Sequence, residues 1–155
     1  MSLEIIQADF DNPEHAEHIV YLTDQYARDP MGGGTPLTDE AKARMVEGLK
    51  NMPNALVLLA YLDGEAVGIA NCFIGFATFP ARRLIYVHDL AVIPTKRGQN
   101  IGLNLLNAVQ ETGKELGCYA ISLEVLENNP AKRLYERFGF DFEKPNYLFA
   151  KKVID

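Results

Sequence analysis

The sequence predicts a single α/β or α+β domain with its elements in the order β-α-α-β-β-β-α-β-α-β. Its 155 residues are about one domain's length, and they contain no internal repeat, low-complexity tract or proline-rich linker. Apolar residues recur at helical spacing near the amino end and in short continuous runs in the middle. Residues 86–125 read as strand, helix and strand, which predicts one crossover unit. We therefore expect one domain over residues 1–155.

The amino-terminal third predicts a strand and two helices. The strand covers residues 3–8. Asn12 and Pro13 are a favoured pair at a helix start, and this helix must end before Pro30. Its buried face is expected at Ala16, Ile19, Val20, Thr23 and Ala27. After a glycine loop, Thr38 caps a second helix. The buried face of that helix is expected at Ala41, Met45, Val46 and Leu49.

The remaining chain predicts more strands, separated towards the end by two helices. Asp63-Gly64 is a strong hairpin signal because both turn positions need positive φ. The expected strands are residues 55–61, 66–74, 84–92, 119–125 and 146–152. The first helix runs from 101 to 116, and the second opens at Asn129-Pro130 and ends at Gly139. The first should bury Leu105, Leu106, Val109 and Leu116, with Gly117 as its stop.

Composition argues against a nucleic-acid-binding or membrane protein. The 15 lysines and arginines face 21 acidic residues, for a net charge of -6. Nucleic-acid binding needs clustered cations that neutralise phosphates, whereas an acidic chain suits solubility and a cationic ligand. The longest apolar run, residues 55–61, is far shorter than the roughly 20 residues that span a bilayer. The amino end lacks the pattern of a signal peptide, so we expect a cytoplasmic protein.

Cysteine and histidine spacing predicts no metal site. Cys72 and Cys118 lie in apolar surroundings and are typical of reduced core thiols. Neither a CxxC nor a HExxH motif occurs. His15 and His18 can share a helix face, but neighbouring glutamates make a solvated surface the better interpretation.

One segment, HDLAVIPTKRGQNIG at residues 88–102, carries candidate chemistry. It reads as a strand, a turn at Pro94, and a basic loop that opens a helix. Free N–H groups at a helix start, with Lys96 and Arg97 beside them, favour binding of a phosphate or pyrophosphate. The segment matches neither the Walker GxxxxGK[ST] pattern nor the GxGxxG pattern. The alternative is a solvated basic turn that only connects strand to helix.

A second element, NNPAKRLYERFGF at residues 128–140, follows the next expected strand. Asn129 can cap the helix, which leaves Asn128 free for another task. The core face is expected at Ala131, Leu134 and Phe138. Tyr135 lies one position round from that face, so its hydroxyl can point into the cleft beside the strand ends. The alternative is a packed aromatic ring with its hydroxyl in water.

Together the two segments resemble the GNAT superfamily of acetyl-CoA-dependent N-acetyltransferases. The family's cofactor signature is Arg or Gln, two residues, Gly, one residue, and Gly or Ala. It reads here Arg97, Gly98, Gln99, Asn100, Ile101 and Gly102. The later family pattern Asn-x-x-Ala-x-x-x-Tyr-x-x-x-Gly-Phe reads here Asn128, Ala131, Tyr135, Gly139 and Phe140. Either motif alone is weak, but both at this separation are specific, and the element order agrees over nearly the whole chain.

The resemblance implies a mixed, mostly antiparallel central sheet flanked by about four helices, and acetyl-CoA as co-substrate with no metal. In this family the strand carrying Leu90, Ala91 and Val92 splays from the following parallel strand. Free backbone groups of Leu90 and Val92 would then pair with the pantetheine arm, and residues 97–102 would hold the pyrophosphate. Asn128, Ala131 and Tyr135 would also lie at the cofactor. The family further suggests a homodimer.

Asn100 departs from the signature, because the family has its first glycine there. Glycine permits positive φ and a close approach of the pyrophosphate to the backbone. Asparagine is the non-glycine residue that best tolerates the left-handed region, so we expect the loop to form. We expect the side chain to crowd the phosphates and weaken cofactor binding.

Amide formation sets the requirements for catalytic groups. An amine with a pKa of about 10.4 is mostly protonated at neutral pH and must lose a proton before it attacks. A backbone N–H near Val92 would serve as donor to the oxyanion. The leaving thiolate, with a pKa of about 8.5, can take a proton from a phenol with a pKa of about 10. Tyr135 fits that role.

Three residues are candidates for the base. His88 titrates nearest neutrality, and its place resembles that of an acidic residue in polyamine-type members. Asp89 faces the other way by strand alternation unless a bulge intervenes. Glu124 lies at the end of the next strand. Relay through water, a reaction with no protein base, and a structural role for a buried His88 stay open.

The acceptor site is expected near residues 26–38, which lie where this family shapes its acceptor. Asp29, Asp39 and Glu40 could draw a cationic amine, although solvated loop acids are the commoner explanation. The leading hypothesis is an enzyme that moves acetyl from acetyl-CoA to a primary amine on a small molecule, by direct attack in a ternary complex. The alternatives are a protein or peptide N-acetyltransferase and a non-catalytic acyl-CoA-binding module, which would need neither Tyr135 nor His88.

Overall fold

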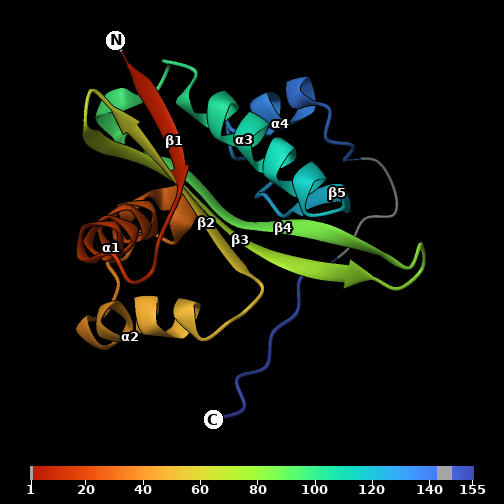
Figure 1. Ribbon diagram of the computed structural model, residues 1–155, viewed down its shortest axis with the longest axis horizontal. Coiled ribbons are helices and arrows are strands. Elements are labelled where there is room, and N and C mark those ends of the chain that lie inside the picture. Colours follow the sequence, from red (N-terminus) through yellow and green to blue (C-terminus); the bar gives the residue numbers. More distant parts are fainter. Residues whose placement is uncertain (1, 143–147) are drawn as a thin grey trace.

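The computed structural model describes residues 2–142 and 148–155. A five-stranded sheet has the order β1-β2-β3-β4-β5, and Figure 1 shows α1 and α2 on one face with α3 and α4 on the other. The strands are β1 (Leu3–Gln7), β2 (Ala55–Leu62), β3 (Glu65–Ala77), β4 (Arg82–Val92) and β5 (Cys118–Leu123). The helices are α1 (Pro13–Arg28), α2 (Asp39–Lys50), α3 (Ile101–Glu115) and α4 (Lys132–Phe138), with short 3-10 turns η1 (Pro30–Gly32) and η2 (Pro94–Lys96).

The sheet is mixed and mostly antiparallel. In the described residues β1, β2, β3 and β4 pair antiparallel in sequence, whereas β4 and β5 are parallel. The parallel pair is joined by α3, which is the crossover unit that the sequence predicts. The fold class expected from the resemblance is thus confirmed.

The expected last strand is wrong. Residues 148–152 form no strand, and residues 146–147 lie outside the described part of the chain. Leu148 and Phe149 are 96% and 76% exposed. A strand is stable in water when its backbone is paired and one of its faces is covered, and these apolar side chains are left in solvent. In the described residues β5 is therefore an edge of the sheet.

Local signals in the sequence set most element ends. Asn12 Oδ1 accepts hydrogen bonds from two N–H groups in the first turn of α1, and Thr38 Oγ1 accepts one in α2. Asp63 and Gly64 have φ of +51° and +85°, as the hairpin turn requires. The start of α4 is two residues later than expected, because Asn129 closes a turn in front of it.

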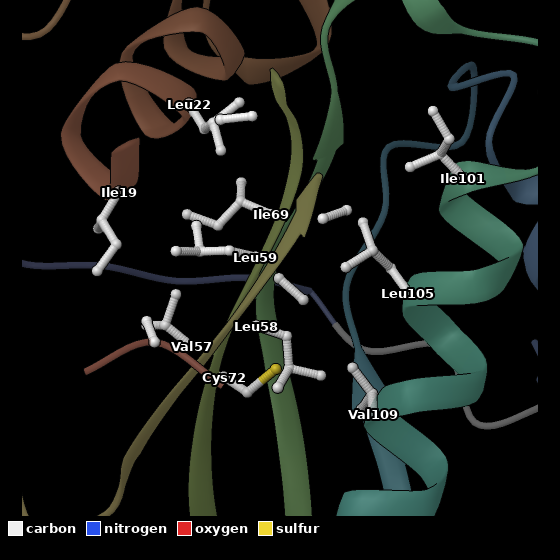
Figure 2. Close-up of a cluster of buried hydrophobic side chains, with 14 of the residues drawn as sticks. Ile19, Leu22, Val57, Leu58, Leu59, Ile69, Cys72, Ile101, Leu105 and Val109 are labelled. Carbon is white, nitrogen blue, oxygen red and sulfur yellow. The ribbon is translucent and has the colours of Figure 1, made fainter. Parts of the chain in front are cut away.

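Buried apolar side chains pack on both faces of β2 and β3. Figure 2 shows Ile19 and Leu22 of α1 on one side of these strands, with Leu105 and Val109 of α3 on the other. These four side chains are at most 2% exposed. Burial of such side chains contributes about 1.5–3 kcal/mol each, and it holds both helices against the sheet.

Leu116 is not in this core, contrary to expectation. It is the residue that follows α3 and is 40% exposed. Gly117 has φ of +78° and turns the chain towards β5, which takes Leu116 off the buried face of the helix.

Candidate active site

A bulge in β4 brings two of the candidate bases together. Asn71 of β3 pairs with Asp89, and the adjacent Cys72 pairs with Val87, so His88 is an extra residue in β4. Strand alternation alone would put His88 and Asp89 on opposite faces of the sheet. Instead, His88 Nδ1 lies 3.4 Å from Asp89 Oδ1. The structure therefore contains the bulge on which the candidacy of Asp89 depends.

The exposed His88 ring lies among aromatic and acidic side chains. It contacts Phe73 and Tyr86 edge-to-face, with centroid distances of 6.1 and 5.8 Å. The Tyr86 hydroxyl donates a hydrogen bond to Glu124 Oε1 at 2.8 Å. The Asp89 carboxylate raises the pKa of His88 above its ordinary value, partly opposed by burial and supported by the charge of Glu124. The three candidate bases thus form one cluster, in contact directly or through Tyr86.

Asn71 holds the second oxygen of Asp89. This residue of β3 is 5% exposed, and its Nδ2 donates to Asp89 Oδ2 at 3.0 Å and to Thr23 Oγ1 at 3.1 Å. Its Oδ1 is buried without a hydrogen-bond partner in the described residues. The bonds hold the Asp89 carboxylate so that its other oxygen faces His88. Sequence reasoning missed Asn71, although an amide inside the apolar run AVGIANCFI was a usable signal.

The carboxyl-terminal half of β4 has an open edge. Its pairing with β5 ends at Val87 and Leu123, so residues 88–92 have no partner there among the described strands. The Ile93 N–H bonds to a carbonyl of β3 at 2.9 Å. Because backbone groups alternate in direction along a strand, those of Leu90 and Val92 face the open edge. Those of Ala91 face β3.

The loop before α3 has the backbone shape of an anion site. Gly98 and Asn100 have φ of +82° and +63°, so Asn100 adopts the left-handed conformation that we expect. Helical residues follow from Ile101. A left-handed residue before a helix start points successive N–H groups in the same direction, which suits an anion. The exposed Asn100 side chain makes no capping hydrogen bond.

The other residues of this loop divide between solvent and core. Gln99 is exposed, whereas Ile101 is 2% exposed and its side chain belongs to the core. A Cβ at Gly102 would lie 3.3 Å from Leu134 Cδ2, so the glycine lets α4 approach α3 closely. Ile101 and Gly102 can therefore offer a ligand only their backbone.

Arg97 is paired within the protein. Its Nη2 donates to Asp29 Oδ2 at 2.7 Å, and its Nε donates to the Val92 carbonyl at 3.1 Å. The Met31 N–H and Arg97 hold the pKa of Asp29 below its ordinary value. Of the three expected acceptor acids, Asp29 is thus neutralised by Arg97. Asp39 and Glu40 lie exposed in the first turn of α2, where they complement the helix dipole.

Tyr135 is the buried residue of α4. It is 6% exposed and packs edge-to-face on Phe140 at a centroid distance of 5.7 Å. Burial raises its pKa to about 12, and the nearby Tyr26 adds to the rise. Tyr26 belongs to α1, and α1 and α4 cover opposite faces of the sheet (Figure 1). The Tyr135 phenol therefore stays protonated at neutral pH.

Asn129 caps the turn before α4 by accepting a hydrogen bond from the Ala131 N–H at 2.9 Å. Asn128 is exposed and is not part of this cap, as the sequence predicts. Ala131 is half-buried. The carbonyl of Ala131 accepts the Tyr135 N–H, so the turn also sets the position of Tyr135.

Several features lie apart from this site. One hollow is formed by α3, β5 and the end of α4, and another by α1 and α2, and neither includes the 97–102 loop or the His88 cluster.

Residues 2–142 and 148–155 contain no group of three His, Cys, Asp or Glu side chains that could hold a metal ion. None of the helices described is both long enough and apolar enough to cross a membrane.

Comparison with known proteins gives related sequences over parts of the chain. This chain is 30% identical over 102 residues to the aminoalkylphosphonate N-acetyltransferase of Salmonella typhimurium, and the match covers 65% of each chain. It is 35% identical over 74 residues to the thialysine N-epsilon-acetyltransferase of Bos taurus, covering 47% of this chain and 43% of that protein. The chain therefore spans less than two thirds of the length of these curated relatives.

The comparison of folds extends over nearly all of the chain. A solved aminoglycoside N-acetyltransferase, AAC(6')-Iy in complex with CoA, has a TM-score of 0.76 and 22% identity, covering 98% of this chain and 96% of that one. At this identity the likeness concerns the fold alone. Residues 10–140 match the model of the acetyltransferase (GNAT) family, a span that contains the 97–102 loop, the open edge of β4 and Tyr135. The chain belongs to the acetyltransferase (GNAT) family.

Proposed function

We propose that this protein transfers the acetyl group of acetyl-CoA to a primary amine on a small molecule, by direct attack in a ternary complex. One observation carries the proposal: the open edge of β4 lies between a backbone anion site and a cluster of proton-transfer groups. The relatives support an amine acceptor, since the Salmonella and bovine proteins are named for aminoalkylphosphonate and thialysine. A protein or peptide amine is the second candidate.

The residues present fit CoA. Backbone groups of Leu90 and Val92 face an edge without a strand partner in the described residues, where an amide-containing arm can pair. At the end of that edge, Gly98 and Asn100 shape the N–H groups in front of α3 for a pyrophosphate. Apart from its two chain neighbours, no described residue lies within 4 Å of the position of a Cβ at Gly98, and Gly98 itself is exposed. Bound acetyl-CoA would supply the acetyl group as a thioester.

On the acceptor side, His88 is the base that the geometry favours. Its Nδ1 faces Asp89, which leaves Nε2 to accept a proton from the acceptor ammonium, directly or through water. Asp89 and Glu124 stabilise the imidazolium that results. Asp89 is held by Asn71, so we assign it the role of positioning His88. A backbone N–H near Val92 serves as donor to the oxyanion.

Tyr135 acts on the leaving-group side. Its phenol is protonated at neutral pH, so it can donate first a hydrogen bond and then a proton to the sulfur. Burial makes the phenol a weaker acid, but the same surroundings raise the pKa of a thiolate next to it, which offsets the loss. A protein that only bound acyl-CoA would need neither this phenol nor the His88 cluster.

An acetyl-CoA thiol-release assay tests the proposed function. The acceptor panel contains polyamines, aminoglycosides, aminoalkylphosphonates, amino acids and peptides. We expect acetylation of at least one small primary amine, with formation of free CoA that depends on the acceptor. Turnover on peptides alone would favour the second candidate. Binding of acetyl-CoA without turnover on any amine would leave the non-catalytic binding module.

Tyr135→Phe should lower kcat by about 10²- to 10⁴-fold, the usual contribution of general acid catalysis. The ring and its contact with Phe140 remain, so the affinity for acetyl-CoA should stay nearly unchanged. Measurement of kcat and of the acetyl-CoA Kd for both forms separates catalysis from binding. An unchanged kcat, where chemistry limits the rate, would make Tyr135 a packing residue.

The rate should fall at acidic pH with an apparent pKa above the ordinary His value, because a base must be unprotonated and carboxylates raise the pKa of His88. Asp89→Asn should move this acidic limb to lower pH while activity is kept. His88→Gln should remove the limb and lower kcat by about 10²-fold or more. Profiles of kcat/KM against pH measure all three. Loss of activity in Asp89→Asn with an active His88→Gln would reverse the assignment.

Asn100→Gly should keep or improve the affinity for acetyl-CoA. Glycine adopts the φ of +63° without strain and removes an exposed side chain from the phosphate path. Calorimetry on both forms gives the two Kd values. A clear loss of affinity would mean that the amide side chain itself contacts the cofactor.

A further inference from the structure

We propose that the ion pair between Asp29 and Arg97 is a latch, which closes the cofactor site in the free protein and is exchanged for the pyrophosphate when CoA binds. The two residues are 68 positions apart and join the end of α1 to the loop before α3. The inference rests on the proposed function, because it takes residues 97–102 to be the pyrophosphate site.

In the described part of the chain the Arg97 side chain makes two hydrogen bonds, and both are with groups that matter for the proposed CoA binding. Its Nε donates to the carbonyl of Val92, a residue whose backbone groups face the open edge where the pantetheine arm would pair. Its Nη2 donates to Asp29 at 2.7 Å. In this arrangement the Arg97 guanidinium donates a hydrogen bond to the Val92 carbonyl at the open edge, and the Asp29 carboxylate neutralises its charge. Full pairing of a CoA molecule along β4 therefore requires Arg97 to move.

Charge makes the two states exclude each other. The Asp29 side chain is 14% exposed, so its carboxylate is poorly screened by water. In the described residues Arg97 is its one ion-pair partner. A pyrophosphate brings further negative charge to the same guanidinium, which cannot neutralise both groups. Asp29 thus competes with the phosphates for Arg97 and repels them.

The latch also connects the cofactor side to the acceptor side. Asp29 Oδ1 accepts the Met31 N–H at 2.9 Å, and the Asp29 carbonyl accepts the N–H groups of Gly32 and Gly34 at 2.8 and 2.9 Å. Asp29 therefore organises the loop that follows α1. The pKa of Tyr26 is raised by burial, then by the charge of Asp89, and then by the charge of Asp29. Asp29 therefore lies near Tyr26 and the acceptor cluster. Release of Arg97 removes the contact of this loop with the cofactor loop.

Asp29→Asn tests the latch without removing the turn, because the Asn side chain can still accept the Met31 N–H. The expected result is a Kd for CoA about 5- to 10-fold lower than that of the unchanged protein, as loss of one nearby charge predicts. Inorganic pyrophosphate, as a competitor of CoA, should gain affinity by a similar factor. Calorimetry measures binding without any acceptor or turnover.

Glu65→Gln is the matched control. Glu65 lies 3.8 Å from Lys96, the residue before Arg97, and both side chains of this pair are more exposed than Asp29. The variant removes the same charge beside the same loop but leaves Arg97 paired. We expect little change in the Kd for CoA. An equal gain in both variants would mean that net charge alone acts, and would overturn the latch.

The outcomes separate the latch from the proposed function. Suppose that the wild-type protein binds CoA and acetylates an amine, but that Asp29→Asn binds CoA no more tightly than the wild-type protein. The latch is then wrong, and the proposed function stands. If the unchanged protein does not bind CoA, both are wrong. Circular dichroism checks folding of Asp29→Asn. Asp29→Ser, which keeps a capping oxygen but is too short to reach Arg97, should give the same gain.

Discussion

The site depends on the place where β4 loses β5 as its neighbour. Upstream of that point, Ile85 and Val87 are buried at 0% and 3% exposure, so β4 is part of the core. Downstream, the strand continues for five residues with one backbone edge unpaired by any described strand. Backbone polar groups need hydrogen-bond partners, and here the Val92 carbonyl accepts a hydrogen bond from the Arg97 side chain. A rigid strand with an unsatisfied edge is a template for an amide-containing ligand, and the core fixes its position.

The bulge in β4 places ionisable side chains beside that open edge. One extra residue puts His88 and Asp89 side by side and leaves Val87 in the core. Asn71 supports this arrangement at a cost, since an unsatisfied buried acceptor such as its Oδ1 costs about 1–3 kcal/mol. Asn100 adds a left-handed backbone that costs about 1–2 kcal/mol for most side chains and less for asparagine. Such local costs are typical of functional sites, and the core on both faces of the sheet supports them.

In the function that we propose, electrostatics divides the site into an acceptor side and a cofactor side. The acceptor side contains Asp89 and Glu124 and has no lysine or arginine in contact with either carboxylate among the described residues. The cofactor side contains the helix start of α3 and the basic residues before it. Arg97 joins the loop before α3 to β4 at Val92 and to Asp29 at the end of α1. Through the latch that we propose, binding on one side would therefore affect the other.

The sequence by itself determined the features that depend on near neighbours. Caps at Asn12 and Thr38, the Asp63-Gly64 turn, the crossover unit and the left-handed Asn100 follow from local rules, and all are present. The motifs also singled out residues 97–102 and Tyr135, to which we assign cofactor binding and proton transfer only as a proposal. The tertiary structure decided what depends on pairing between distant segments: the register that makes His88 a bulge, the Asn71 and Thr23 support of Asp89, and the Asp29–Arg97 pair. The misplaced last strand and Leu116 have the same origin, because apolar pattern shows that a side chain can be buried, whereas only the fold supplies the surface that buries it.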